Sequence, residues 1–174
     1  MKKAILIIFA IILGNKSAFA TIEDIGNLTQ VIVPAYAFGM AVNEDGWDGT
    51  KEFITQFAAM ELAVNALKLT IHEQRPDASD HMSFPSGHSA AAFSGAAFIH
   101  KRYGFRRAII PYLAAGFTGF SRIHANRHHT HDVIAGALIG GLIGYFMTSR
   151  KESNFDTSAE ISPDGAKLNF KATF

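Results

Sequence analysis

Apolar side chains recur along the middle of the chain with the period of a helix. Between residues 53 and 71 they follow one another in alternating steps of four and three, which places them on one face of an α-helix. The set is Phe53, Phe57, Met60, Val64, Leu67 and Ile71. This is the clearest helix that the sequence predicts.

Four further apolar segments accompany this helix, separated by short polar stretches: residues 28–42, 89–100, 108–120 and 133–147. In the last segment Gly136, Gly140 and Gly144 fall on one side, a ridge that lets another helix approach closely. No strand pattern competes between residues 21 and 150. The predicted fold class is therefore all-α, a compact bundle of about five or six helices.

The first twenty residues have the pattern of a secretory signal. Two lysines follow the initial methionine, an apolar run extends from Ala4 to Gly14, and Ala18-Phe19-Ala20 matches an Ala-x-Ala cleavage site. The run of eleven residues is shorter than the roughly twenty that a membrane-spanning helix needs. We therefore expect residues 1–20 to be a signal peptide cleaved after Ala20, with an uncleaved anchor as the alternative.

The rest of the chain divides into an apolar part and a polar end. Residues 21–150 are long enough for one domain with its own core. After Arg150 the composition turns polar, and apolar and polar residues alternate from 167 to 174, which is the period of a strand. We expect residues 151–174 to be a flexible polar tail, with a short strand as the alternative.

Composition excludes several kinds of site and partner. The chain has no cysteine, which excludes disulfides and thiolate metal ligands. Its formal net charge is +1 at pH 7, too small for a field that attracts nucleic acid, so we expect no nucleic-acid partner. Any electrostatic argument must rest on local clusters of charge.

Three polar clusters lie at the junctions of the predicted helices. Each has a structural explanation when taken alone, such as a helix cap. Together they supply three cations, two histidines, a glycine at a helix start and a carboxylate, the groups needed for phosphoryl transfer through a covalent histidine intermediate. The clusters are Lys68 with Arg75-Pro76, Pro85-Ser86-Gly87-His88, and Ser121-Arg122 with His128 and Asp132.

Five of these residues have the properties of phosphate ligands. Arg75 and Arg122 offer planar forks of N–H donors, and Lys68 adds a point charge, so they can offset phosphate charge without a metal. Ser86 is a predicted N-cap, and Gly87 lets an anion approach the N–H groups of the helix that starts there. We expect a phosphate site at these helix ends.

The two histidines have complementary predicted roles. His128 is the nucleophile, and Asp132, four residues later, can accept a hydrogen bond from one imidazole nitrogen and fix the tautomer. His88 protonates the leaving oxygen and then activates water. His128, His88 and Asp132 are thus the predicted catalytic residues.

A metal site is the main rival interpretation, because four histidines and a carboxylate crowd into nine residues: His124, His128, His129, His131 and Asp132. His124 and His128 have the spacing of a zinc-binding helix. Against it, Ala125 stands where a His-Glu-x-x-His motif has its glutamate. We expect no metal and no cofactor.

The three clusters resemble the signature of the type 2 phosphatidic acid phosphatase superfamily, which also includes bacterial acid phosphatases, glucose-6-phosphatase and vanadium haloperoxidases. The elements Lys-x6-Arg-Pro, Pro-Ser-Gly-His and Ser-Arg-x5-His-x3-Asp are complete between residues 68 and 132. The resemblance implies a helical core over about residues 28–148. It also implies the same roles for the catalytic and phosphate-binding residues named above.

The expected function is that of a metal-independent phosphatase that hydrolyses phosphate monoesters or pyrophosphates through a phosphohistidine. The favoured partner is a lipid phosphate of the bacterial envelope, at a membrane surface; the oligomeric state stays open. An acid phosphatase on soluble monoesters is the first alternative. A vanadate-dependent haloperoxidase is a weaker one, since the chain is short, and a non-catalytic phosphate-binding module leaves His88 and the His128–Asp132 pair without a role.

The expected location is the periplasm. Apolar segments of about 13 to 17 residues are more typical of buried core helices than of membrane spans. A compact periplasmic domain is therefore favoured over an integral membrane protein, which stays open as the alternative.

Overall fold

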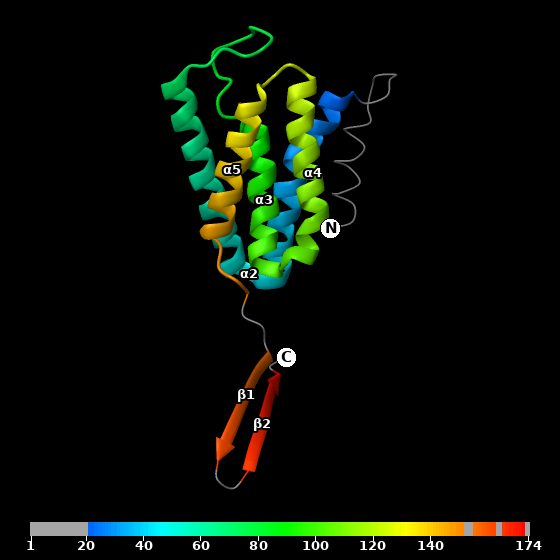
Figure 1. Cartoon of the computed structure of the whole chain (residues 1–174), viewed down its shortest axis with the longest axis vertical. Helices are drawn as coiled ribbons and strands as arrows, with labels where there is room; N and C mark the ends of the chain where they lie inside the picture. The colour runs from blue at the N-terminus through cyan, green and yellow to red at the C-terminus, as the bar shows by residue number, and fades with distance from the viewer. Residues whose placement is uncertain (1–20, 152–154, 163–164, 173–174) are drawn as a thin grey trace.

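Four helices form a bundle in this computed structural model, which describes residues 21–151, 155–162 and 165–172. They are α2 (Ile22–Ile71), α3 (Gly87–Tyr103), α4 (Phe105–His124) and α5 (Thr130–Phe146) (Figure 1). The all-α class is confirmed. The expected five or six helices are slightly too many, because the predicted segments 28–42 and 53–71 both fall within α2. The predicted signal peptide lies outside the described residues.

The long helix α2 reverses direction at Gly46. Gly46 has φ 61° and ψ −133°, a conformation that glycine adopts at little cost because it has no Cβ. Figure 1 shows the segments before and after it running in opposite directions along the bundle. At the start of α2 the Thr21 hydroxyl accepts from the Asp24 N–H at 3.1 Å, and the Asp24 carboxylate accepts from the Thr21 N–H at 3.1 Å. This capping box defines where the helix begins.

Helix α3 is the centre of the bundle and contacts the other three helices. Its alanines are buried, and such small side chains leave room for neighbours on every side. The predicted glycine ridge of α5 is confirmed. A Cβ added to Gly136, Gly140 or Gly144 would lie within 2.5 Å of a carbonyl oxygen of Ser86, Ala90 or Ser94. The backbones of α3 and α5 therefore touch, which holds the ends of these helices in register.

The outside of the bundle carries many large apolar side chains. The exposed fraction reaches 77% for Ile110 and 71% for Leu62, and the others include Val31, Leu69, Leu113, Leu138, Leu142 and Phe146. By length and composition, α2 is the one helix in the described part of the chain that could cross a membrane. An apolar exterior of this extent is typical of a surface that meets lipid or another protein.

The polar end of the chain, expected as a flexible tail or a short strand, has two antiparallel strands within residues 155–162 and 165–172. Its strands are β1 (Phe155–Ser162) and β2 (Gly165–Ala172), and Ser162 pairs with Gly165. The sequence offered a strand as the alternative for the last residues only, so β1 was not predicted. No described residue of the helices contacts these strands, which leaves the bundle as the part that positions the candidate site.

Candidate active site

The three predicted clusters meet at one end of the bundle. The end of α2, the loop that follows it, the start of α3 and the connection from α4 to α5 all lie at this end (Figure 1). Hydrogen bonds join the segments, because the Ser86 N–H donates to the Asp132 carbonyl at 3.0 Å and Arg75 Nη1 donates to the Arg127 carbonyl at 3.0 Å. The three clusters thus form one region.

His128 is buried in this region, with only 3% of its side chain exposed. Its Nε2 lies 3.2 Å from Nη1 of Arg75. A guanidinium can only donate, so Nε2 is the acceptor and the proton of the neutral ring is on Nδ1. This tautomer leaves Nε2 with the lone pair that a nucleophile needs.

The surroundings of His128 also keep its ring neutral. Burial, and then the positive charges of Arg75 and Lys68, lower the pKa of the His128 imidazole to about 4, against the opposite effect of the Asp132 carboxylate. Both effects disfavour the charged ring. The imidazole is therefore unprotonated on Nε2 at neutral pH.

Asp132 is fully buried, and its Oδ2 oxygen faces the histidine. Oδ2 lies 3.6 Å from His128 Nδ1, an approach longer than a hydrogen bond. The same oxygen accepts from the Ser83 hydroxyl at 2.5 Å and from the His129 N–H at 2.9 Å. These donors hold the carboxylate beside the proton-bearing nitrogen of His128. Ser83 was not singled out from the sequence.

Asn27 contacts both Arg122 and His88, and the sequence did not single it out. Asn27 Oδ1 accepts from Arg122 Nη1 at 2.9 Å and lies 3.1 Å from His88 Nε2. Because this oxygen only accepts, Nε2 of His88 carries a proton. Arg122 also donates from Nη2 to the Glu23 carbonyl at 2.9 Å and from Nε to the Ser121 hydroxyl at 3.1 Å. The ring of His88 is thus oriented with a donor at the site.

Lys68 lies beside the start of α3. Its Nζ donates to the Met82 carbonyl at 2.6 Å, and no described carboxylate forms an ion pair with it. A Cβ added to Gly87 would lie 4.0 Å from Lys68 Cε and 3.8 Å from Val64 Cγ1, which is ordinary contact. A methyl group would therefore fit at Gly87 without a clash, in contact with Lys68 and Val64.

Ser86 caps α3, as the sequence predicts. Its hydroxyl accepts from the Ser89 N–H at 3.4 Å and from the Ser89 hydroxyl at 3.1 Å, and the residue is fully buried. The side chain of Ser86 is thus engaged with the helix. The N–H groups of the first helical turn, which have no partner within a helix, are the donors that this segment offers to an anion.

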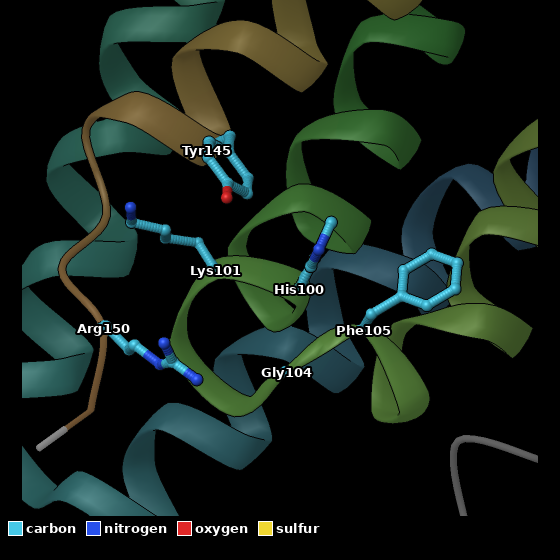
Figure 2. A pocket seen from close by; sticks show the side chains of 6 residues that line it. All are labelled: His100, Lys101, Gly104, Phe105, Tyr145 and Arg150. Atoms are coloured by element: carbon cyan, nitrogen blue, oxygen red, sulfur yellow. The ribbon is translucent and has the colours of Figure 1, made fainter. Parts of the chain in front are cut away.

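A separate pocket of about 200 Å³ lies at the far end of α3 (Figure 2). Its lining includes His100, twelve residues after His88 along the helix, a separation of about 18 Å at 1.5 Å per residue. None of the predicted site residues lines it. The full lining is His100, Lys101, Gly104, Phe105, Tyr145 and Arg150.

The residues of the rival metal interpretation are only partly brought together. His131 and Asp132 lie next to Glu73, with the three ligand atoms within 4.8 Å of one another. His124 instead stacks on Phe120 at 5.7 Å between ring centroids. The zinc-helix spacing of His124 and His128 therefore does not produce a metal-binding pair in the described residues.

Comparison with known proteins gives a family for the segment that holds these residues. The sequence profile of the PAP2 superfamily matches residues 50–156. Lipid A 1-phosphatase of Porphyromonas gingivalis is 35% identical over 168 residues, which is 92% of this chain and 36% of that protein. Lipid A 4'-phosphatase of Helicobacter pylori is 37% identical over 92 residues, which is 52% of this chain and 46% of that protein. The chain thus covers less than half the length of these relatives.

A solved structure shares the fold. The transmembrane PAP2-type phosphatidylglycerolphosphate phosphatase of Bacillus subtilis superposes with a TM-score of 0.57 at 28% identity, and the match covers 72% of each chain. Residues 68 to 132, which carry the three clusters, fall inside the segment matched by the family profile.

Proposed function

The chain belongs to the PAP2 superfamily, and on this basis we propose that it is a lipid phosphate phosphatase that uses His128 as its nucleophile. One observation carries the proposal. A buried neutral imidazole directs its lone pair at the Arg75 guanidinium. The side chains of Lys68 and Arg122 donate to neutral oxygens, and Arg75 keeps one ion pair, with the half-exposed Asp80. A phosphate group placed there would replace those oxygens as the acceptor.

The first step transfers the phosphoryl group to the histidine. Lys68, Arg75, Arg122 and the first-turn N–H groups of α3 bind the phosphate oxygens, and Arg75 exchanges its contact with Nε2 for one of them. The freed lone pair forms the N–P bond while the P–O bond to the leaving group breaks. Burial, and then the charges of Arg122, Arg75 and Lys68, lower the pKa of the His88 imidazole to about 4. The bound phosphate offsets these charges, so that His88 is protonated on both nitrogens and donates its Nε2 proton to the leaving oxygen as the imidazolium.

The second step returns the enzyme to its starting state. Water attacks the phosphohistidine, gives its proton to His88, and the N–P bond breaks to release inorganic phosphate. Asp132 stabilises the positive ring of the intermediate through Nδ1–H. Three cations at the site supply the charge stabilisation that a metal gives in other phosphatases, so the proposed reaction is metal-independent.

The exterior of the bundle supports a lipid as the substrate and a membrane as its location. Large apolar side chains face outward on α2, α4 and α5. Helices of 17 residues, such as α3 and α5, are about 25 Å long at 1.5 Å per residue, near the thickness of a bilayer core. We propose that the bundle sits in the membrane with the site at its surface, on the periplasmic side if the predicted signal acts as expected.

The test is hydrolysis by the purified full chain in detergent. Phosphatidic acid and lipid A in mixed micelles are compared with a soluble aryl phosphate, each with and without EDTA. We expect faster phosphate release from the lipids, insensitivity to EDTA and no release by the His128→Ala variant. Equal or faster turnover of the soluble ester would favour the acid phosphatase alternative, and activity lost to EDTA and restored by zinc would contradict the proposal.

A further inference from the structure

A second cluster of ligand-type side chains lies on the outer side of Asp132. His131 Nε2 is 2.7 Å from Glu73 Oε1 and 3.2 Å from Asp132 Oδ1. The three ligand atoms lie within 4.8 Å of one another. One imidazole and two carboxylates form a donor set that suits a divalent transition cation such as Zn²⁺.

The Oδ1 oxygen of Asp132 is an independent indication that this cluster binds a ligand. The residue is fully buried, and Oδ1 has no hydrogen-bond partner among the residues that the structure describes, because the nearby His131 Nε2 is bonded to Glu73 instead. A buried carboxylate oxygen without a donor costs free energy. Oδ2 has two donors and faces His128, whereas Oδ1 faces His131. The unsatisfied oxygen is thus directed into the cluster.

The cluster is open to solvent and held by its surroundings. The side chains of His131 and Glu73 are 60% and 28% exposed, so an ion can reach them. The backbone carbonyl of Glu73 accepts from the Ser83 N–H at 2.9 Å, which ties the glutamate to the residue that bonds Asp132. The ring of His129 stacks on that of His131 at 5.3 Å, and its Nε2 lies 3.9 Å from Glu73 Oε1, near enough to supply another ligand after a small movement.

We propose that Glu73, His131 and Asp132 bind a divalent transition cation, and that this cation inhibits the enzyme. A cation on Oδ1 would draw negative charge away from the Asp132 carboxylate. That carboxylate is the group that stabilises a positive His128 ring, so phosphoryl transfer would slow. The ion would sit on the opposite side of Asp132 from the attacking nitrogen. Inhibition rests on the function proposed above, whereas binding does not.

Binding is tested first, on the full chain in detergent after treatment with EDTA and removal of the chelator. Calorimetric titration with Zn²⁺ should give one saturable site in the wild type. The site should be lost in Glu73→Gln and His131→Asn. It should persist in His124→Asn, which changes an exposed histidine outside the cluster. Absence of saturable binding, or equal binding by His131→Asn, would overturn the proposed site.

Inhibition is tested on the same proteins by phosphate release from a lipid phosphate. Saturating Zn²⁺ should lower the wild-type rate about tenfold, a partial loss of the charge that the carboxylate supplies. Glu73→Gln and His131→Asn should keep the metal-free rate and resist Zn²⁺. The inhibitory role would be overturned if Zn²⁺ left the wild-type rate unchanged or raised it. It would also be overturned if Zn²⁺ lowered the rates of the wild type and both variants equally. Failure of the proposed function would look different. Neither the wild type nor any variant would then release phosphate from the lipid, although the wild type would still bind Zn²⁺.

Discussion

The two ends of the bundle provide different partners for their arginines. At the end away from the candidate active site, Arg102 donates to the Asp45 carboxylate at 2.6 Å and also bonds Glu52. At the other end, Arg122 donates to an amide oxygen and a carbonyl, and its nearest ion-pair partner, Glu23, lies 3.9 Å away. Both arginines are largely buried, so burial does not explain the difference.

This difference separates a structural charge from one that is available to a ligand. Two carboxylates neutralise the charge of Arg102, so this side chain has no excess positive charge to attract an anion. Neutral oxygens satisfy the donors of Arg122 without cancelling its charge, and a phosphate makes stronger, charge-assisted bonds in their place. The type of partner therefore distinguishes Arg122 from Arg102. Arg75 is intermediate, because its Nε keeps an ion pair with the half-exposed Asp80 carboxylate at 2.8 Å while its other nitrogens bond neutral groups.

The largest expected effect is that of His128→Ala, which removes the group that the cations surround. Turnover of a lipid phosphate should fall by more than about 10⁴-fold, as when other covalent nucleophiles are deleted. Initial rates of phosphate release measure it, and circular dichroism with size exclusion in detergent checks that the variant is folded. A folded variant with a rate near that of the wild type would remove His128 from the mechanism.

Arg122→Ala tests the ligand-binding end directly. The loss of a preorganised donor to the developing charge should lower kcat/KM by about 10² to 10³-fold. Arg122→Lys keeps the charge but loses the fork, so its kcat/KM should lie between those of wild type and Arg122→Ala. If both variants match the wild type, the cation is not part of the phosphate site.

Asn27→Asp should make the ligand-binding end resemble the structural one. It places a carboxylate against Arg122 where the amide oxygen now lies 2.9 Å away, as Asp45 lies against Arg102. The added negative charge should raise KM about tenfold by repelling phosphate. Asn27→Ala is the control, since it removes the positioning contact without adding charge. A KM for Asn27→Asp no higher than that of Asn27→Ala would contradict the charge argument.

Arg102→Ala should have the smallest effect on activity and a clear effect on stability. It removes the cation that joins two carboxylates. Asp45 keeps Tyr103 and Lys151 and Glu52 keeps the Ser149 N–H, so the free energy of unfolding should fall by about 2 kcal/mol, the contribution of hydrogen bonds to charged groups. Unfolding in detergent with increasing SDS measures this loss. The kcat/KM of the folded fraction should equal that of the wild type, and a large drop would mean that the two ends are not independent.

Local helical spacing explains what could be predicted from the sequence. The Ser86 cap and the ridge of Gly136, Gly140 and Gly144 depend on residues within a few turns of one helix, and the structure has both. The approach of His128 to Asp132 was likewise expected from a spacing of four residues, although it stops at 3.6 Å.

Residues that join the site through tertiary contacts could not be found in this way. Asn27 and Arg122 are 95 positions apart, and Ser83 and Asp132 are 49 positions apart. A lone asparagine or serine carries no periodic signal that would set it apart from any other polar residue. Positions of this kind become visible only when the helices are packed.

Sequence patterns could not predict the apolar exterior either. Short apolar segments were expected to be core helices, because hydropathy records how apolar a segment is but not which face points outward. Here buried alanines and glycines fill much of the space between helices, and large side chains such as Ile110 and Leu62 lie outside. Small residues can form the interior only if the backbones approach closely, as α3 and α5 do.

The most direct test of the central claim is to trap the covalent intermediate. The full chain in detergent is mixed with a lipid phosphate carrying a radiolabel on its phosphorus and quenched with alkali, in which phosphohistidine survives. We predict label on the wild type, mapped to His128 by peptide analysis, and none on the His128→Ala variant. Label on a residue other than His128, or unlabelled wild-type protein that still releases phosphate when sampled within the first turnover, would contradict this account.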